Sequence, residues 1–280
     1  MGSTNKFDYS ITFPCYNAVE YTKKCIDGMI KNQEDLSRVV VVDNGSTDGT
    51  QAYLESLPLG GVILNKQNMG VGVALNQGAL ALQSEWTIVM DNDIVPSKGW
   101  IEDLISSAIA NDLRVISPAM VEGELSYDLN AFAPEAKDKM SGYIRLGDNH
   151  AVCLAIHKSV WQEAGYFRAA PSLLGYEDTL FFHELKKKGI KTAITGEAWL
   201  HHFGSATQKA MKKARGLQPK DDLSVPNNHV LLCQNWFSRK LDKIKKIKFR
   251  KKMQQQEIDQ FGMTVRGDRI DNRFIWYGEY

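Results

Sequence analysis

Two carboxylates one residue apart, Asp91 and Asp93, follow the apolar run Trp86–Met90. Side chains alternate along a strand, so both carboxylates are expected on the same side where the chain leaves a sheet. Clustered carboxylates suit a hard divalent cation, and such a cation suits a diphosphate. Acids after a strand also serve as turn residues or helix caps, so the pair by itself fits a metal site and a simple turn equally well.

Two further predicted strands end in polar or turn-forming residues in the same way. Val39–Val42 ends at Asp43, and Tyr9–Phe13 ends at Pro14, ahead of a helix predicted from about Val19 to Lys31. Strand-to-helix units repeated in this way predict a βαβ nucleotide-binding sheet. Ligands of open α/β sheets bind beyond the carboxyl ends of the strands, so we expect these strand ends to meet at a ligand site.

Six short motifs stand in a characteristic order along the chain. They are Phe13-Pro14-Cys15-Tyr16-Asn17, Val42-Asp43-Asn44-Gly45-Ser46-Thr47-Asp48-Gly49-Thr50, Asn68-Met69-Gly70 with Asn76-Gln77-Gly78, Asp91-Asn92-Asp93, Gly175-Tyr176-Glu177-Asp178, and His201-His202-Phe203-Gly204. Together they resemble the motifs of family 2 glycosyltransferases, over roughly residues 8 to 207. The resemblance implies an α/β fold of the GT-A type, a Rossmann-like mixed sheet flanked by helices that binds a nucleotide-diphospho-sugar.

The same resemblance assigns Asp43 to the base and ribose of the nucleotide. A carboxylate that accepts hydrogen bonds from a uracil or thymine imide is chemically reasonable. The alternative is that Asp43 begins an Asx-turn over Gly45. Small residues near Gly70 would let the backbone approach the nucleotide closely. The donor-binding residues implied in this way are Pro14, Tyr16, Asn17, Asp43, Asn68, Gly70, Asn76, Asp91, Asn92 and Asp93.

A metal site is also implied. Asp93 is expected to bind Mg²⁺ or Mn²⁺ that bridges the donor diphosphate, while Asp91 lies nearer the ribose. His202 is the expected further metal ligand, in preference to its neighbour His201. An imidazole among oxygen ligands favours Mn²⁺ over Mg²⁺.

Glu177 and Asp178 precede an amphipathic helix predicted from Thr179 to Lys188. By resemblance, Asp178 is the catalytic base that takes the proton of the acceptor hydroxyl in an inverting displacement, and Glu177 positions the acceptor or the base. The alternative is that the two acids only stabilise the N-terminus of the helix.

The chain of 280 residues, 43% of them hydrophobic, can bury a substantial core. No apolar run approaches the roughly 18 residues of a membrane span, and no charged-then-apolar leader opens the chain, so we expect a cytoplasmic protein, with a peripheral position at the inner membrane face as the alternative. The four cysteines form no Cys-x-x-Cys pair, which favours reduced thiols.

Positive charge is concentrated near the C-terminus. Between Lys209 and Lys252 stand 14 Lys and Arg but only three Asp, a net charge of +11 that leaves −10 for the rest of the chain. Ser238–Gln256 is predicted to be a basic helix with a narrow apolar stripe at Leu241, Ile244 and Ile247. It is interpreted as a solvated helix on the catalytic domain or, alternatively, as a surface at residues 238–256 for an anionic membrane or a polyanionic acceptor.

The predicted organisation is a GT-A catalytic domain at residues 1–207 and a basic, partly helical extension at 208–280, with a soft boundary at about 208–228. The domain divides into a nucleotide-sugar-binding half at about 7–120 and an acceptor-side half at 121–207. Residues 120–148 lose periodicity and gain Gly, Pro and charge, so they are predicted to form a loop-rich insertion over the acceptor side.

The predicted function is metal-dependent, inverting transfer of a sugar from a UDP- or dTDP-linked donor to a hydroxyl of a glycan or glycolipid. The alternative acceptor is DNA carrying a hydroxylated base, as in phage-type DNA glycosylation. A sugar nucleotidylyltransferase would have a Gly-rich loop with Arg and Lys after the first strand, where this chain has Pro14-Cys15-Tyr16-Asn17. An inactive nucleotide-sugar-binding module would be expected to have lost Asp93 or Asp178.

Overall fold

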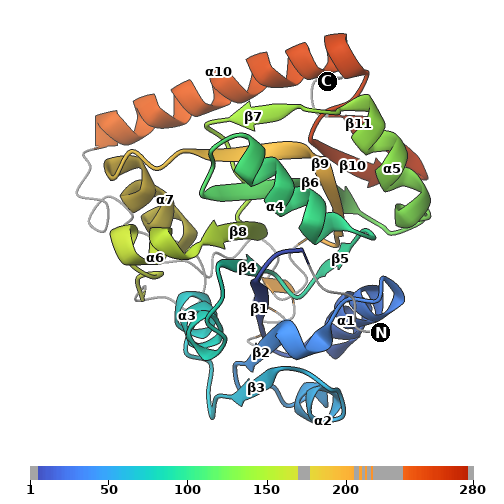
Figure 1. Cartoon of the computed structure of the whole chain (residues 1–280), viewed down its shortest axis with the longest axis vertical. Helices are drawn as coiled ribbons and strands as arrows, with labels where there is room; N and C mark the ends of the chain where they lie inside the picture. Colours follow the sequence, from blue (N-terminus) through green and yellow to red (C-terminus); the bar gives the residue numbers. More distant parts are fainter. Residues whose placement is uncertain are drawn as a thin grey trace.

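The strands form a mixed sheet with helices packed against it (Figure 1), and the apolar side chains of the central strands are buried on both of its faces. In β4, Ile88 and Met90 pack into one core, and Val89 between them packs into another. Because strand side chains alternate, one short apolar run supplies both cores. The computed structural model describes residues 6–169, 177–204, 208–209, 212, 216 and 236–276.

The N-terminal half is a parallel sheet in the order β4-β1-β2-β3. The helix predicted from about Val19 to Lys31 is present as α1, with these bounds. Gly78 of the later helix α3 (Val71–Ala81) faces Thr12 of β1, and a Cβ at Gly78 would overlap the Thr12 side chain. Glycine at this position therefore allows α3 to lie close to the sheet. The elements are β1 (Tyr9–Cys15), α1 (Val19–Lys31), η1 (Leu36–Arg38), β2 (Val39–Asp43), α2 (Thr50–Glu55), β3 (Gly61–Leu64), α3 (Val71–Ala81) and β4 (Trp86–Met90).

The second half makes the sheet mixed. β8 lies between β4 and β6 and is antiparallel to both, whereas β9 is parallel to β6 and antiparallel to the short strands β5 and β7. Helices α1 and α4 cover one core, and α3, α6 and α7 cover the other. The elements are β5 (Ile94–Pro96), α4 (Trp100–Ala110), β6 (Val115–Gly123), α5 (Leu129–Lys139), β7 (Ile144–Leu146), β8 (Cys153–His157), α6 (Lys158–Ala164), α7 (Glu177–Lys187) and β9 (Thr192–His202).

The prediction of a loop-rich insertion at residues 120–148 was wrong. The segment continues β6, forms helix α5 and ends in β7. Asp128 caps α5 by accepting hydrogen bonds from the backbone N–H groups of Asn130 and Ala131. Pro134 lies inside this helix, where the sequence alone indicates a break. Phe132 packs against the buried Trp199 of β9, and this tertiary contact outweighs the poor local signal.

The C-terminal part of the chain joins the same sheet, which the sequence analysis did not anticipate. It contains α10 (Trp236–Phe261), β10 (Arg266–Ile270) and β11 (Arg273–Trp276). β10 is parallel to β6, with Arg266 opposite Met120, and β11 forms the edge of the sheet. Most of the boundary predicted at 208–228 lies outside the described residues, but residues 266–276 form one sheet with the catalytic domain.

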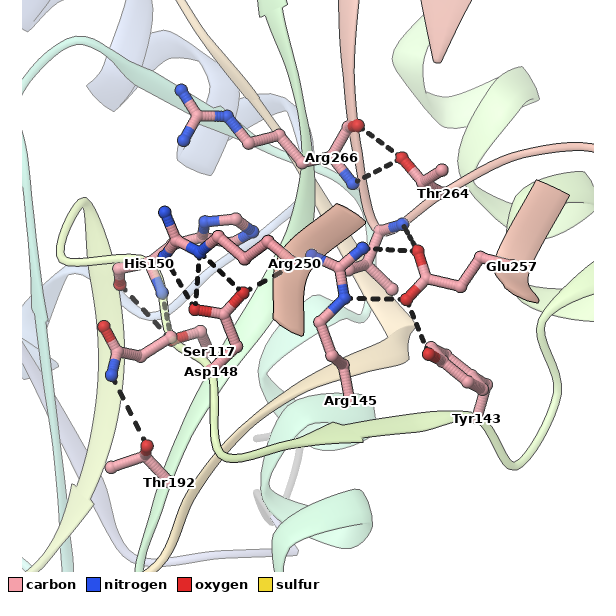
Figure 2. Close-up of polar contacts among 12 residues, drawn as sticks. Ser117, Tyr143, Arg145, Asp148, His150, Thr192, Arg250, Glu257, Thr264 and Arg266 are labelled. Carbon is pink, nitrogen blue, oxygen red and sulfur yellow. Dashed lines mark hydrogen bonds and ion pairs between the residues drawn. The ribbon is translucent and has the colours of Figure 1, made fainter. Parts of the chain in front are cut away.

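Helix α10 runs beside β7 (Figure 1) and is attached to it by a buried ion pair. Arg145 of β7 donates from Nε to Oε1 of Glu257 over 2.7 Å and from Nη2 to Oε2 over 2.5 Å. Tyr143, which immediately precedes β7, donates to the same carboxylate. Figure 2 shows both Arg145 and Tyr143 in contact with Glu257. The side chains of Arg145 and Glu257 are 2% and 0% exposed, so this pair fixes the helix against the sheet.

Among the described residues, no helix is both long and apolar enough to cross a bilayer.

Candidate functional site

A cavity of about 290 Å³ opens at the carboxyl ends of β1 and β4. This is the edge at which open α/β sheets bind ligands. Nine residues predicted for the site line it: Pro14, Tyr16, Asn68, Asp91, Asn92, Asp93, Glu177, Asp178 and His202. Its lining also includes Asn44, Ala151, Val152, Phe167 and Gln208, which were not predicted. None of residues 120–148, all of which are described, lines this cavity.

Asp91, Asp93 and His202 form a cluster in the cavity. One potential ligand atom from each lies within 4.8 Å of the others, and His202 Nε2 is 3.3 Å from Asp93 Oδ1. Strand pairing brings them together, because Ile94 is opposite His202 and the backbone N–H of Phe203 donates to the Asp93 carbonyl over 2.9 Å. Two carboxylates and an imidazole are a donor set that fits Mn²⁺ or Mg²⁺.

His202 is enclosed by acids on both ring nitrogens. Its Nε2 faces Asp93, and its Nδ1 is 3.3 Å from Glu122 Oε2. Burial lowers the pKa of His202, but the hydrogen bonds to Asp93 and Glu122 outweigh it and raise the pKa to about 10. The ring is therefore held by carboxylates on both sides.

His201 lies on the opposite side of β9 and takes no part in the cluster. Its Nδ1 is 3.1 Å from the Tyr127 hydroxyl and its Nε2 is 3.1 Å from the Gly123 carbonyl. Burial lowers the pKa of His201 to about 4, so the ring is neutral at physiological pH. Of the two neighbouring histidines, His202 is the one whose ring faces Asp93 and Glu122.

Negative charge accumulates around Asp91. Burial, followed by the neighbouring Asp93 carboxylate, raises the pKa of Asp91 to about 8. Glu177 and Asp178 act in the same direction from the start of α7. A divalent cation between these carboxylates would relieve the repulsion, which is a second indication that the residues fit a metal.

Glu177 and Asp178 occupy the first turn of α7 and line the cavity. Asp178 accepts hydrogen bonds from the backbone N–H and the hydroxyl of Thr179. Both expectations for these acids are therefore compatible with the structure, because a helix start and a cavity wall coincide here. Gly175 and Tyr176 of the same motif lie outside the described residues.

Asp43 does not line the cavity. Its Oδ1 accepts hydrogen bonds from the backbone N–H groups of Gly45 and Ser46 and from Gln51 Nε2, at 3.1, 2.9 and 2.7 Å. The Asx-turn considered as the alternative is thus formed. Its Oδ2 faces the Cys15 thiol at 3.6 Å, and the side chain is fully buried.

Asn17, Gly70 and Asn76 also lie outside the cavity lining. Asn17 accepts from the Thr47 backbone N–H, and Gly70, with φ of 88°, donates to the Asn68 side chain at the start of α3. Asn76 exchanges two hydrogen bonds with the backbone of Phe167, at 2.7 and 3.0 Å. These three residues hold the loops that border the cavity.

Sequence reasoning missed Glu122 and Arg266. Glu122 follows Val115–Val121, a mostly apolar segment interrupted by Ser117 and Pro118, so the strand-then-acid signal seen before Asp43 and Asp91 was present only in weaker form. Arg266 Nη2 is 3.1 Å from Glu122 Oε2, but nothing in the sequence places β10 beside β6. A contact of this kind follows only from the tertiary fold.

Comparison with known proteins gives a consistent result. The chain is 29% identical over 107 residues to an uncharacterized glycosyltransferase of Haemophilus influenzae, which covers 37% of this chain and 33% of that protein. It is 25% identical over 147 residues to the glycosyltransferase AglE of Haloferax volcanii, covering 50% of this chain and 47% of that one. The chain thus spans between a third and a half of the length of these curated relatives.

Solved structures share the fold. A mannosyltransferase of Pyrobaculum calidifontis in complex with GDP-Man and Mn²⁺ aligns with a TM-score of 0.53 at 16% identity, over 71% of this chain and 57% of that one. GalNAc-T7 with UDP, GalNAc and Mn²⁺ aligns with a TM-score of 0.56 at 14% identity, over 72% and 44%. The architecture is accordingly the GT-A fold. The family model described as glycosyl transferase family 2 matches residues 10–181, more than half of the chain, and the chain belongs to this family.

Proposed function

We propose that this chain is a metal-dependent, inverting glycosyltransferase that moves a sugar from a UDP- or dTDP-linked donor to a hydroxyl of a glycan or glycolipid. One observation carries the proposal: Asp91, Asp93 and His202 share a single cavity with Glu177 and Asp178. Family membership supports glycosyl transfer, and the two structural neighbours hold Mn²⁺ with GDP-Man or with UDP.

Asp91, Asp93 and His202 would hold the cation. When bound, Mn²⁺ or Mg²⁺ supplies positive charge that neutralises the departing nucleoside diphosphate. Asp93 and His202 are buried, so they offer ligand atoms from a rigid part of the sheet. Ligand atoms placed in this way would hold a bound cation, and with it the diphosphate, in one position.

Pro14, Tyr16 and Asn68 line the cavity on the side of β1 and the loop before α3, and we assign them to the nucleotide. Asp43 lies behind this wall. With Oδ1 engaged in its turn, only Oδ2 remains to accept from a base, which would require the Cys15 side of the wall to adjust.

Asp178 is the proposed general base. It takes the proton of the acceptor hydroxyl while the acceptor oxygen bonds to the anomeric carbon and the bond from that carbon to the diphosphate oxygen breaks. A single displacement of this kind inverts the anomeric configuration. Glu177, one residue earlier in the same turn, orients the acceptor hydroxyl.

A panel of nucleotide sugars tests this function. The protein is incubated with UDP-, dTDP- and GDP-linked sugars, with Mn²⁺, with Mg²⁺ and with a chelator, and mass spectrometry detects free or transferred sugar. We expect release of sugar from UDP- or dTDP-linked donors that depends on the cation. Equal turnover in excess chelator would contradict the metal site, and no turnover of any donor would contradict the function.

The exposed side chains of α10 support the proposal that the acceptor lies at a membrane. Leu241, Ile244 and Ile247 are 55, 41 and 45% exposed, and lysines surround them. Exposed apolar side chains among lysines suit the surface of an anionic membrane. We therefore propose that residues 238–256 contact such a membrane peripherally and that the enzyme works in the cytoplasm on a glycolipid or growing glycan at its inner face. DNA with a hydroxylated base is the alternative acceptor, since lysines also suit phosphates.

A further inference from the structure

We propose that Glu122 and Arg266 are positioning residues for His202, so that strand β10, beyond the part of the chain that the family model matches, completes the metal site. The inference rests on the proposed function, because it takes Asp91, Asp93 and His202 as the cation site. It adds residues from the ends of two strands, β6 and β10, that the sequence motifs do not include.

The two nitrogens of His202 face different carboxylates. Nε2 is 3.3 Å from Asp93 Oδ1, and Nδ1 is 3.3 Å from Glu122 Oε2. A neutral imidazole can offer one nitrogen to a cation only if the other carries the proton, and a carboxylate that accepts this N–H fixes the tautomer and the ring orientation. Glu122 is therefore placed to direct the lone pair of Nε2 toward Asp93 and the cation.

Three neighbours lie around the Glu122 carboxylate: His202, Arg266 and the backbone at Gly204. It lies opposite His202 in the pairing of β6 with β9, which puts both side chains at the same level of the sheet. Arg266 Nη2 is 3.1 Å from Oε2, the same oxygen that faces the imidazole. At Gly204, with φ of 74°, a Cβ would lie 3.3 Å from Glu122 Oε1, so the chain passes close to the carboxylate there.

Arg266 reaches Glu122 because β10 is parallel to β6. Arg266 is opposite Met120 and Asp268 is opposite Glu122 in this pairing. Figure 2 shows the Arg266 side chain extending away from the Arg145–Glu257 pair that fixes α10. The guanidinium holds the carboxylate, and the carboxylate holds the metal ligand.

A purely structural role is the competing interpretation, in which Arg266 and Glu122 only join β10 to β6. The two interpretations differ in their effect on the cation. If the pair positions His202, its loss weakens coordination by the imidazole in a protein that is still folded. If the pair is structural, only thermal stability changes.

Manganese binding to the full chain separates these interpretations. Isothermal titration with Mn²⁺ gives the affinity, and pulsed EPR of the Mn²⁺-loaded protein detects the ¹⁴N coupling of a coordinating imidazole. We expect Glu122→Gln to lower the Mn²⁺ affinity by ~10- to 100-fold and to weaken the ¹⁴N coupling, as for other carboxylates behind a histidine ligand. Arg266→Gln should have a smaller effect in the same direction, and His202→Ala should abolish the coupling.

Glu163→Gln is the matched control. It breaks another arginine–carboxylate pair, Arg114–Glu163 at 2.7 Å, whose side chains are 38 and 39% exposed and which lies outside the cavity lining. It should leave Mn²⁺ affinity and the ¹⁴N coupling unchanged. If Glu122→Gln does not fold, Glu122→Asp keeps the charge but shortens the side chain, and it should show the same weakening.

Wild-type affinity and coupling in folded Glu122→Gln or Glu122→Asp would overturn the inference, and so would a wild-type protein whose bound Mn²⁺ shows no imidazole coupling. Failure of the proposed function looks different. In that case the wild-type protein binds Mn²⁺ through His202 with the predicted dependence on Glu122 but turns over no nucleotide sugar.

Discussion

Arg250 of α10 donates to Asp148 through Nη2 at 2.6 Å and Nε at 3.0 Å. Asp148 begins the segment that continues to Ala151 and Val152 in the cavity wall, and the Val152 carbonyl accepts from the Asp91 backbone N–H over 2.9 Å. The basic helix is therefore attached to the same segment that borders the acidic cluster. Arg250 serves the fold, and it should be left in place when the surface charge of α10 is tested.

Replacing Asp93 should remove the cation without unfolding the protein. Asp93→Asn keeps the side-chain shape, and it lowers the repulsion on the neighbouring Asp91 carboxylate in the metal-free protein. We expect Mn²⁺ affinity and cation-dependent donor turnover to fall by ~100-fold or more, which corresponds to the loss of about 3 kcal/mol. Calorimetry with Mn²⁺ and a donor-turnover assay measure the two quantities, and a thermal melt checks the fold. A destabilised variant that keeps wild-type Mn²⁺ affinity would show that Asp93 is structural.

Asp178→Asn should separate binding from transfer. The amide preserves the shape of the side chain at the start of α7 but cannot accept the acceptor proton. Transfer should fall by roughly 10²-fold or more, the scale of a lost general base, while affinity for the nucleoside diphosphate and Mn²⁺ stays near the wild-type value. Calorimetry and a transfer assay give the two quantities, and full activity of the variant would move the base to Glu177.

Breaking the buried pair between α10 and β7 should be costly. Glu257→Ala leaves Arg145 buried without its main counter-charge, for which we expect a loss of ~3–5 kcal/mol in the free energy of unfolding. Lys251→Ala on the exposed part of the same helix should change it by less than about 0.5 kcal/mol. Chemical denaturation of both variants checks this, and equal stabilities would show that the pair contributes little.

Glu34 should make stability depend on pH. Burial raises its pKa from 4.5 to about 7. Below pH 4.5 the carboxyl is neutral in both states, and between pH 4.5 and 7 the unfolded chain loses the proton that the folded protein keeps. The stabilising contribution present at low pH is therefore lost as the pH rises through this window.

Glu34→Gln cannot ionise, so it should lack this loss. The free energy of unfolding of the wild type, relative to the variant, should fall by roughly 1–3 kcal/mol between pH 4.5 and pH 8. Denaturant unfolding at several pH values measures the difference. Parallel profiles for the two proteins would show that Glu34 ionises normally in the fold.

Neutralising exposed lysines of α10 tests its partner. Lys245, Lys248, Lys251 and Lys252 changed to Gln should weaken binding to anionic liposomes by up to ~10³-fold, because about 1 kcal/mol for each lysine at the membrane surface adds up to about 4 kcal/mol. Donor hydrolysis should stay unchanged, because these residues lie outside the cavity lining. Binding to duplex DNA, with transfer to a hydroxymethylated base, would instead favour the DNA alternative. Unchanged binding would leave α10 as a solvated helix.

The sequence was most informative where chemistry follows directly from a strand. Asp91 and Asp93 were found because an apolar run places them at its end, and β4 has the bounds of that run. The predicted roles of Asp43 and Asn76 rested on resemblance alone, and the structure shows hydrogen bonds to loops that a motif does not report. Helix α5 was missed because Pro134 is locally unfavourable and only long-range aromatic contacts compensate for it.

The pairing of β10 with β6 has a consequence for synthesis of the chain. The edge of β6 from Met120 to Gly123 is covered by residues 266–269, which are synthesised long after β6 itself. Until then the nascent protein presents an unpaired strand edge, and such edges template association with other chains. Glu122 on this edge can therefore meet Arg266 only once β10 has left the ribosome, and chaperones that shield strand edges are expected to raise the yield of active protein.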